Sequence, residues 1–191
     1  MKTISRIALV LLISLLASPP FLFLAHTQPP DETSDGILLS GDSLSNWSST
    51  YASLALSTNT YYTEPASIAW TTKRASNQFI SWVTLGTGGY GVYWDLSTTP
   101  ILHARVNPQV IPPGAYLQVV MYDSNWVYYS YAPTTLVAGT WTDINIDLRT
   151  PLTGGTPSLD KVYGIQFYWV FNGGLKADFT TYIDEIEATT S

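Results

Sequence analysis

The sequence contains no cysteine and little charge, and each shortage excludes a class of protein. Without cysteine there is no disulfide framework, no thiolate metal site, no cysteine nucleophile and no lipoprotein acylation site. Charged residues make up 12% of the chain, about half the usual share. Because hydrophobic residues reach 46%, this low charge does not indicate disorder. A packed globular domain is therefore expected.

Basic residues are scarcer than acidic ones. The chain has 8 Lys and Arg against 14 Asp and Glu. Two of the basic residues, Lys2 and Arg6, lie in the first 26 residues, so the remainder carries six basic and fourteen acidic groups, a net charge of −8. We therefore expect no nucleic-acid partner, and anionic polysaccharides are disfavoured, since binding to either requires Lys and Arg.

The N-terminal segment has the composition of an export signal. Lys2 and Arg6 precede an apolar stretch from Ile7 to Ala17, and a proline pair separates it from a second short apolar run. Residues 1–25 are either a cleaved signal peptide or an N-terminal membrane anchor, and 26–36 form a polar linker. The domain of residues 37–191 is then secreted, or lies on the outer face of the membrane. The membrane is a partner only through this segment.

Short runs of β-forming residues, separated by turn residues, fill the chain after residue 36. This pattern predicts an all-β sandwich or barrel with no helical segment. The expected strands are 37–40, 50–57, 67–72, 79–85, 90–95, 101–106, 115–122, 126–132, 141–148, 162–171 and 179–188.

Alternation along three of these strands separates a core face from an outer face that is rich in aromatic and hydrogen-bonding side chains. Aromatic rings stack on the C–H faces of sugars, and amide, imidazole and guanidinium groups bond their hydroxyls. The alternative is that these residues only line a solvent-facing sheet. The candidate ligand-binding residues are His103, Arg105, Tyr116, Gln118, Tyr122, Gln166 and Tyr168. Tyr129 and Tyr131 are candidates to extend this face, and Trp82, Trp94 and Trp126 are candidates for a separate platform at the loop ends.

Catalytic groups are sparse. Asp143 and Asp147 share one face of the strand at 141–148, but four residues place them ~13 Å apart, too far for a glycosidase pair. The domain has one histidine, His103, and no nucleophile or phosphate-loop motif. The sequence therefore predicts no catalytic residues, with a small polysaccharide lyase or hydrolase as the catalytic alternative.

Four segments, taken in order, resemble the jelly-roll, galactose-binding-like carbohydrate-binding modules that accompany secreted glycoside hydrolases. They are LLSGDSLSNW at 38–47, GAYLQVVMYDSNWVYYSY at 114–131, AGTWTDINIDL at 138–148, and KVYGIQFYWVF at 161–171 with TTYIDEIEA at 180–188. The resemblance implies a two-sheet antiparallel β-sandwich of jelly-roll type, with about 8–11 strands and a concave glycan-binding face.

The resemblance also implies a structural calcium ion, with Asp42, Glu64 and Asp184 as candidate ligands, and no organic cofactor. The function we expect is non-catalytic binding of an extracellular glycan or polysaccharide. The alternative is a cell-surface or envelope protein whose aromatic faces assemble with identical subunits or other surface proteins.

Overall fold

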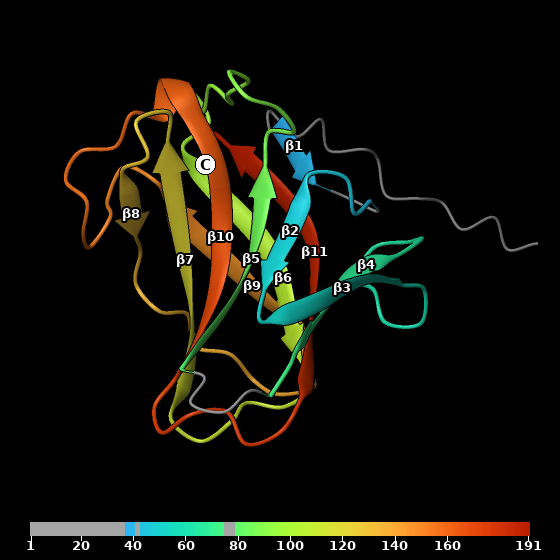
Figure 1. Ribbon diagram of the computed structural model, residues 1–191. Coiled ribbons are helices and arrows are strands. Elements are labelled where there is room, and N and C mark those ends of the chain that lie inside the picture. The colour runs from blue at the N-terminus through green and yellow to red at the C-terminus, as the bar shows by residue number, and fades with distance from the viewer. Residues whose placement is uncertain (1–36, 41–42, 75–78) are drawn as a thin grey trace, which may run out of the picture. The chain divides into compact units, whose positions relative to one another are not determined.

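The computed structural model describes residues 37–40, 43–74 and 79–191, all within one compact unit, Ser34–Ser191 (Figure 1). The predicted signal or anchor (1–25), the linker (26–36) and the candidate ligand Asp42 lie outside the described residues. In the described part of the chain, no helix has the length and apolar character needed to cross a membrane.

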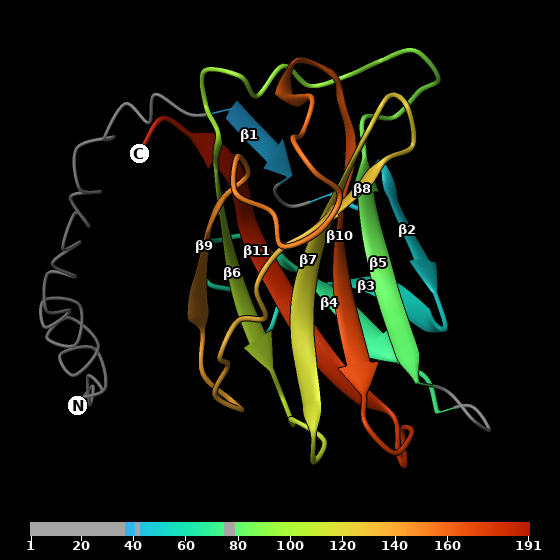
Figure 2. The same ribbon diagram turned by 90° about the vertical axis from the view of Figure 1, so that its left-hand side faces the viewer.

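Two antiparallel sheets form the domain (Figure 1 and Figure 2). The six-stranded sheet runs in the order β3-β4-β11-β6-β9, with β1 also paired to β11. Its strands are β1 (Ile37–Ser40), β3 (Ala52–Ser57), β4 (Ser67–Thr72), β6 (Ile101–Pro108), β9 (Thr142–Asp147) and β11 (Phe179–Thr189).

The five-stranded sheet runs in the order β2-β5-β10-β7-β8. Its strands are β2 (Trp47–Thr50), β5 (Ile80–Gly86), β7 (Ala115–Asp123), β8 (Tyr128–Ser130) and β10 (Val162–Phe171). A single 3-10 turn, Leu159–Lys161, precedes β10. The predicted all-β, two-sheet sandwich is confirmed.

The core lies between the sheets and is made by alternate residues of each strand. On β7 the buried side chains are Leu117, Val119 and Met121, and on β10 they include Phe167 and Trp169. Strand geometry turns every second side chain to the opposite side, so the intervening residues form the outer face. The core face that alternation predicts for these two strands is therefore made by apolar residues, as expected.

Two predicted strands differ in the structure. The predicted strand 50–57 is two strands, because Tyr51 has a positive φ of 58° and the chain passes there from the five-stranded to the six-stranded sheet. The predicted strand 90–95 is a loop, in which only Trp94 bridges to Val162. Gly91, at φ 79°, takes a left-handed conformation that interrupts extended structure.

Candidate functional site

The outer face of the five-stranded sheet carries most of the exposed aromatic rings, and we call it the aromatic face. Its register places Tyr168 of β10 directly between Trp82 of β5 and Gln118 of β7. Directly opposed residues on one face of a sheet are in contact range. The rings of the aromatic face are Tyr51, Trp82, Tyr93, Tyr122, Trp126, Tyr128, Tyr163 and Tyr168.

One group of rings lies over β5 and β10. Trp82 stacks on Tyr168, with centroids 5.1 Å apart and planes 12° from parallel. Tyr51 meets Trp82 edge-on at 6.1 Å. Stacked and edge-to-face pairs of this kind stabilise each other beyond simple area burial. Their mutual support holds the rings in fixed orientations.

A second group surrounds Tyr122 at the end of β7. Tyr122 stacks on Trp126 at 5.5 Å and on Tyr128 at 5.4 Å, and Tyr163 contacts both Tyr122 and Trp126. The Tyr122 ring lies across Gly164 of β10, where a Cβ would fall 2.5 Å from the phenol oxygen. Glycine at this position therefore makes room for the ring.

The two residues that stack on Tyr122 are open to solvent. Trp126 is 55% exposed and Tyr128 48% exposed, whereas Tyr122 itself is 5% exposed. Tyr122 thus acts as a support beneath two rings whose remaining faces are free for a ligand.

The turn that presents Trp126 is held by one buried carboxylate. Asp123 Oδ1 accepts the amides of Asn125 and Val127 at 2.9 and 3.1 Å, and Oδ2 accepts the Tyr129 hydroxyl at 2.9 Å. Trp126 has a positive φ of 60°, which a bulky side chain rarely adopts. The Asp123 contacts offset this strain and fix the ring on the aromatic face.

Neutral polar groups lie between the rings. Gln166 donates through Nε2 to Thr84 Oγ1 at 3.1 Å, and its buried Oε1 has no partner among the described residues. Gln118 donates to the Tyr131 carbonyl at 2.8 Å. Both side-chain amides thus donate within the protein, and Gln166 is only 7% exposed, so they order the sheet beneath and between the rings.

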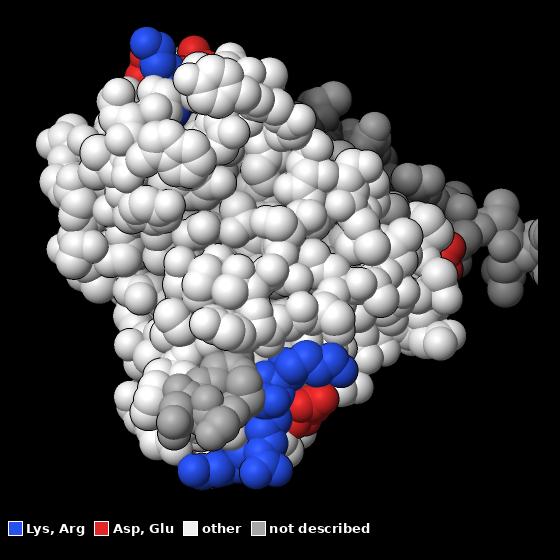
Figure 3. All heavy atoms as spheres, viewed as in Figure 1, with Lys and Arg blue, Asp and Glu red and all other residues white. Residues whose placement is uncertain are grey.

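The aromatic face carries no net charge. Burial, followed by the nearby phenols Tyr128, Tyr163 and Tyr168, raises the pKa of Tyr122 to about 12. Burial and then Tyr128 raise the pKa of Tyr168. The outward positions of the five described strands hold no Lys, Arg, Asp or Glu. Figure 3, drawn from the same viewpoint as Figure 1, shows charged atoms only toward the ends and margin of this view.

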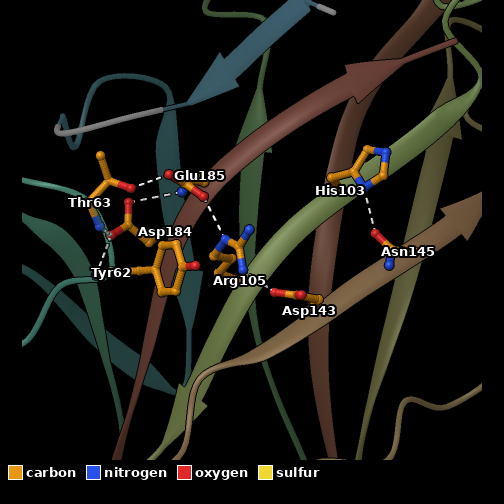
Figure 4. A network of polar contacts seen from close by, with 8 residues as sticks. All are labelled: Tyr62, Thr63, His103, Arg105, Asp143, Asn145, Asp184 and Glu185. Carbon is orange, nitrogen blue, oxygen red and sulfur yellow. Dashed lines mark hydrogen bonds and ion pairs between the residues drawn. The ribbon is translucent and has the colours of Figure 1, made fainter. Parts of the chain in front are cut away.

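The outer face of the six-stranded sheet is different in chemistry, because it carries a charged network (Figure 4). Arg105 donates through Nε to Glu185 at 2.6 Å, pairs with Asp143 through Nη1, and lies 3.8 Å over the ring of Tyr62. Burial lowers the pKa of Arg105, but the hydrogen bond to Glu185 and the charges of Asp143 and Glu185 outweigh it and the pKa is raised. Thr63 also donates to Glu185.

A β-bulge in β11 builds this network. The pairing with β6 shifts register between Asp184 and Glu187, and Glu185 takes a positive φ of 46°. Asp184 is consequently buried and accepts the amides of Tyr62 and Thr63 at 2.8 and 3.0 Å. The bulge therefore attaches the 62–63 loop to the sheet.

His103 lies beside the network in a shallow polar hollow of about 230 Å³. Its Nδ1 contacts Asn145 Oδ1, and its Nε2 lies 2.7 Å from Thr189 Oγ1. Glu187, directly opposite His103 in the register, also lines the hollow.

The seven predicted ligand-binding residues do not share one face. Tyr116, Gln118, Tyr122, Gln166 and Tyr168 lie on β7 and β10 of the five-stranded sheet. His103 and Arg105 lie on β6 of the other sheet and point away from them. Alternation shows which residues face away from the core, but not to which sheet a strand belongs.

The structure also places the other aromatic candidates. Tyr129 and Tyr131 are core residues, since their hydroxyls bond Asp123 and the Leu148 carbonyl inside the sandwich. Trp82 and Trp126 belong to the aromatic face rather than to a separate platform. Tyr51, Tyr93, Tyr128 and Tyr163 also belong to the aromatic face and were not predicted from the sequence. For Trp82 the sequence held a signal: Val83 and Leu85 are apolar core residues, so alternation along the strand turns Trp82 to the outer face.

The predicted calcium ligands can be tested against their surroundings. Glu64 is exposed and accepts from the Tyr61 hydroxyl at 3.3 Å. The Asp184 carboxylate is surrounded by amide N–H donors, which present positive charge where a cation would bind. The described residues contain no cluster of three or more His, Cys, Asp or Glu able to hold a metal ion. Calcium binding at Asp42, Glu64 and Asp184 stays a prediction, because Asp42 lies outside the described residues.

Comparison with known proteins gives matches in structure only. No family model and no curated protein matches the sequence. A family 30 carbohydrate-binding module of a cellulosomal cellulase from Clostridium thermocellum is 15% identical, with a TM-score of 0.61 over 82% of this chain and 98% of its own.

Two enzymes contain a similar domain. An exo-β-agarase is 13% identical, with a TM-score of 0.59 over 80% of this chain. A β-1,2-glucanase from Parabacteroides distasonis is 13% identical, with a TM-score of 0.57 over 83% of this chain. This chain spans about a quarter of each enzyme, 24% and 25%. The fold is that of jelly-roll carbohydrate-binding modules, as the sequence resemblance predicted.

Proposed function

We propose that this protein is a non-catalytic module that binds a neutral glycan through the aromatic face. The observation that carries the proposal is the set of supported, solvent-open rings around Tyr122, Trp126 and Tyr128, on a surface without charge. Stacking on such rings suits the C–H faces of sugars. A neutral surface favours a glycan without carboxylate or sulfate groups, since nothing on it compensates an anion.

The structural likeness supports binding rather than catalysis. The carbohydrate-binding module is matched along almost its whole length, whereas the enzymes are matched over a quarter. Asp143 and Glu185, on the outer face of the six-stranded sheet, are both paired with Arg105.

In this proposal the domain acts outside the cell, because residues 1–25 have the composition of an export signal or anchor. Calcium stays a prediction that rests on the sequence resemblance, and no part of the binding surface described above depends on it.

Retardation electrophoresis in gels containing single polysaccharides tests the proposal. We expect slower migration with at least one neutral polysaccharide, such as hydroxyethyl cellulose or agarose, and none with polygalacturonate. Retardation by polygalacturonate alone would contradict the neutral ligand.

Protein assembly is the alternative function, and the exposed rings favour it as a second candidate, since aromatic residues are enriched at protein interfaces. Sedimentation velocity separates the two. A monomer across the concentration range supports glycan binding, whereas self-association that Trp126→Ala abolishes supports assembly.

A further inference from the structure

A second pocket lies at the end of the sandwich, away from the rings of the aromatic face. It has a volume of about 470 Å³ and forms between the β6–β7 loop and the β10–β11 loop. This volume falls within the range of small-molecule sites. Its apolar lining includes Val110, Pro112, Pro113, Leu175 and Phe179.

The pocket is built on fixed backbone. Ala115 donates to the Pro112 carbonyl at 2.9 Å, closing the first loop, and Gln109 donates to the Thr180 carbonyl at 2.9 Å. The floor continues into the core, because buried Phe179 packs edge-on against Trp169 at 5.4 Å. A preformed apolar hollow favours an apolar ligand without much cost in ordering.

Positive charge gathers at the same end. Lys73, Arg74 and Lys176 are three of the six basic residues that follow residue 36, and Figure 3 shows Lys and Arg clustered at the lower end of the molecule. Asp178 also lines the pocket, but its carboxylate pairs with Lys73 at 3.4 Å and accepts the Arg74 amide. Within the described residues no carboxylate pairs with the Lys176 ammonium, which lines the pocket.

The pocket brings an apolar lining together with a lysine that has no carboxylate partner among the described residues. Of the other described cations, Arg105 and Arg149 pair with carboxylates, and Lys161, the last residue of the 3-10 turn before β10, has no carboxylate partner in the described part of the chain. In a strongly acidic protein, an unpaired ammonium beside an apolar hollow is complementary to a ligand with an apolar body and one negative charge.

We propose that this pocket binds a small amphiphilic carboxylate. The apolar chain of the ligand packs against Val110, Leu175 and Phe179, and its carboxylate meets Lys176. The site shares no residue with the aromatic face, so it is independent of the proposed glycan binding.

An NMR titration with sodium decanoate, below its micelle concentration, tests the proposal. We expect saturable amide shifts at Val110 and at Gly173 to Ala177. Lys176→Gln should weaken binding about two- to fivefold, as loss of one exposed charge contact predicts. Lys161→Gln removes an exposed lysine next to β10 and is the matched control, expected to leave the affinity unchanged.

Two further measurements make the test decisive. Decyltrimethylammonium, with the same chain and the opposite charge, should bind at least tenfold more weakly. Val110→Asp, at an exposed position, places a carboxylate at the mouth and should abolish decanoate binding without unfolding the domain. Equal binding of both amphiphiles, decanoate shifts confined to the aromatic face, or binding to anionic vesicles without binding to decanoate would each overturn the proposal.

Discussion

Gly164→Ala is a small substitution that should disturb the aromatic face without breaking the fold. The added Cβ would lie 2.5 Å from the Tyr122 hydroxyl oxygen and 2.6 Å from two ring carbons. Ordinary contact begins at 3.4 Å, so the ring must retreat by about 0.9 Å. Because Trp126 and Tyr128 both stack on Tyr122, they must move with it.

The stability that Gly164→Ala loses depends on how freely the Tyr122 ring can move. Overpacking a closed core costs about 1–3 kcal/mol, but the rings that cover Tyr122 are open to solvent and can move outward with it, so we expect about 1 kcal/mol of lost stability. The neighbouring Gly86→Ala is the matched control. Gly86 is paired with Gly164 on the same face, but its Cβ would meet nothing closer than the Asn46 carbonyl at 3.8 Å.

The assay combines near-ultraviolet circular dichroism, which reports the packing of the rings, with thermal melting and glycan retardation. Gly164→Ala should change the aromatic spectrum and weaken glycan binding about fivefold, the equivalent of 1 kcal/mol. Gly86→Ala should match the unaltered protein in both. If the two variants gave the same spectrum and the same binding, the account of Tyr122 as a support would be wrong.

Three other predictions follow from the same contacts. Arg105→Ala should lower the free energy of unfolding by about 1–2 kcal/mol in denaturant titrations, because Glu185 and Asp143 lose their cation, while glycan binding stays unchanged. Above pH 10 the melting temperature should fall, since the pKa of Tyr122 is raised to about 12. The unfolded phenol ionises near pH 10, so the stability from its neutral form is lost progressively as the pH rises to about 12. Calcium should raise the melting temperature, a chelator should reverse the rise, and Asp184→Asn should abolish it; an unchanged melting temperature would show that the amide contacts of Asp184 exclude the ion.

The fold could be predicted because apolar core residues alternate strictly with outward-facing residues along the central strands. Leu117, Val119 and Met121 on one strand, and Phe167 and Trp169 on another, are apolar at every second position. Alternation does not reveal where the chain crosses from one sheet to the other. Tyr51, with its positive φ, separates two strands that belong to different sheets, although the sequence predicts one continuous strand there.

The candidate site could be predicted only in part, for a geometric reason. Alternation correctly placed Gln118 and Tyr168 on an outer face, but His103 follows the same rule on the other sheet. The partnership of Tyr122 with Gly164 depends on the register between β7 and β10, which brings together residues 42 positions apart. Pairing of strands distant in sequence is set by the whole fold rather than by local pattern.

The central claim, that the five-stranded sheet holds the glycan site, is tested most directly by comparing the two faces in one binding experiment. Retardation by a neutral polysaccharide should be measured for Tyr168→Ala and Tyr168→Phe on the aromatic face, and for Arg105→Ala on the opposite face. Loss of one central ring should cost roughly 1–3 kcal/mol, so Tyr168→Ala should weaken binding about 5- to 150-fold. Tyr168→Phe, which keeps the ring, and Arg105→Ala should bind nearly as the unaltered protein does. Binding lost in Arg105→Ala but kept in Tyr168→Ala would contradict the account and move the site to the six-stranded sheet.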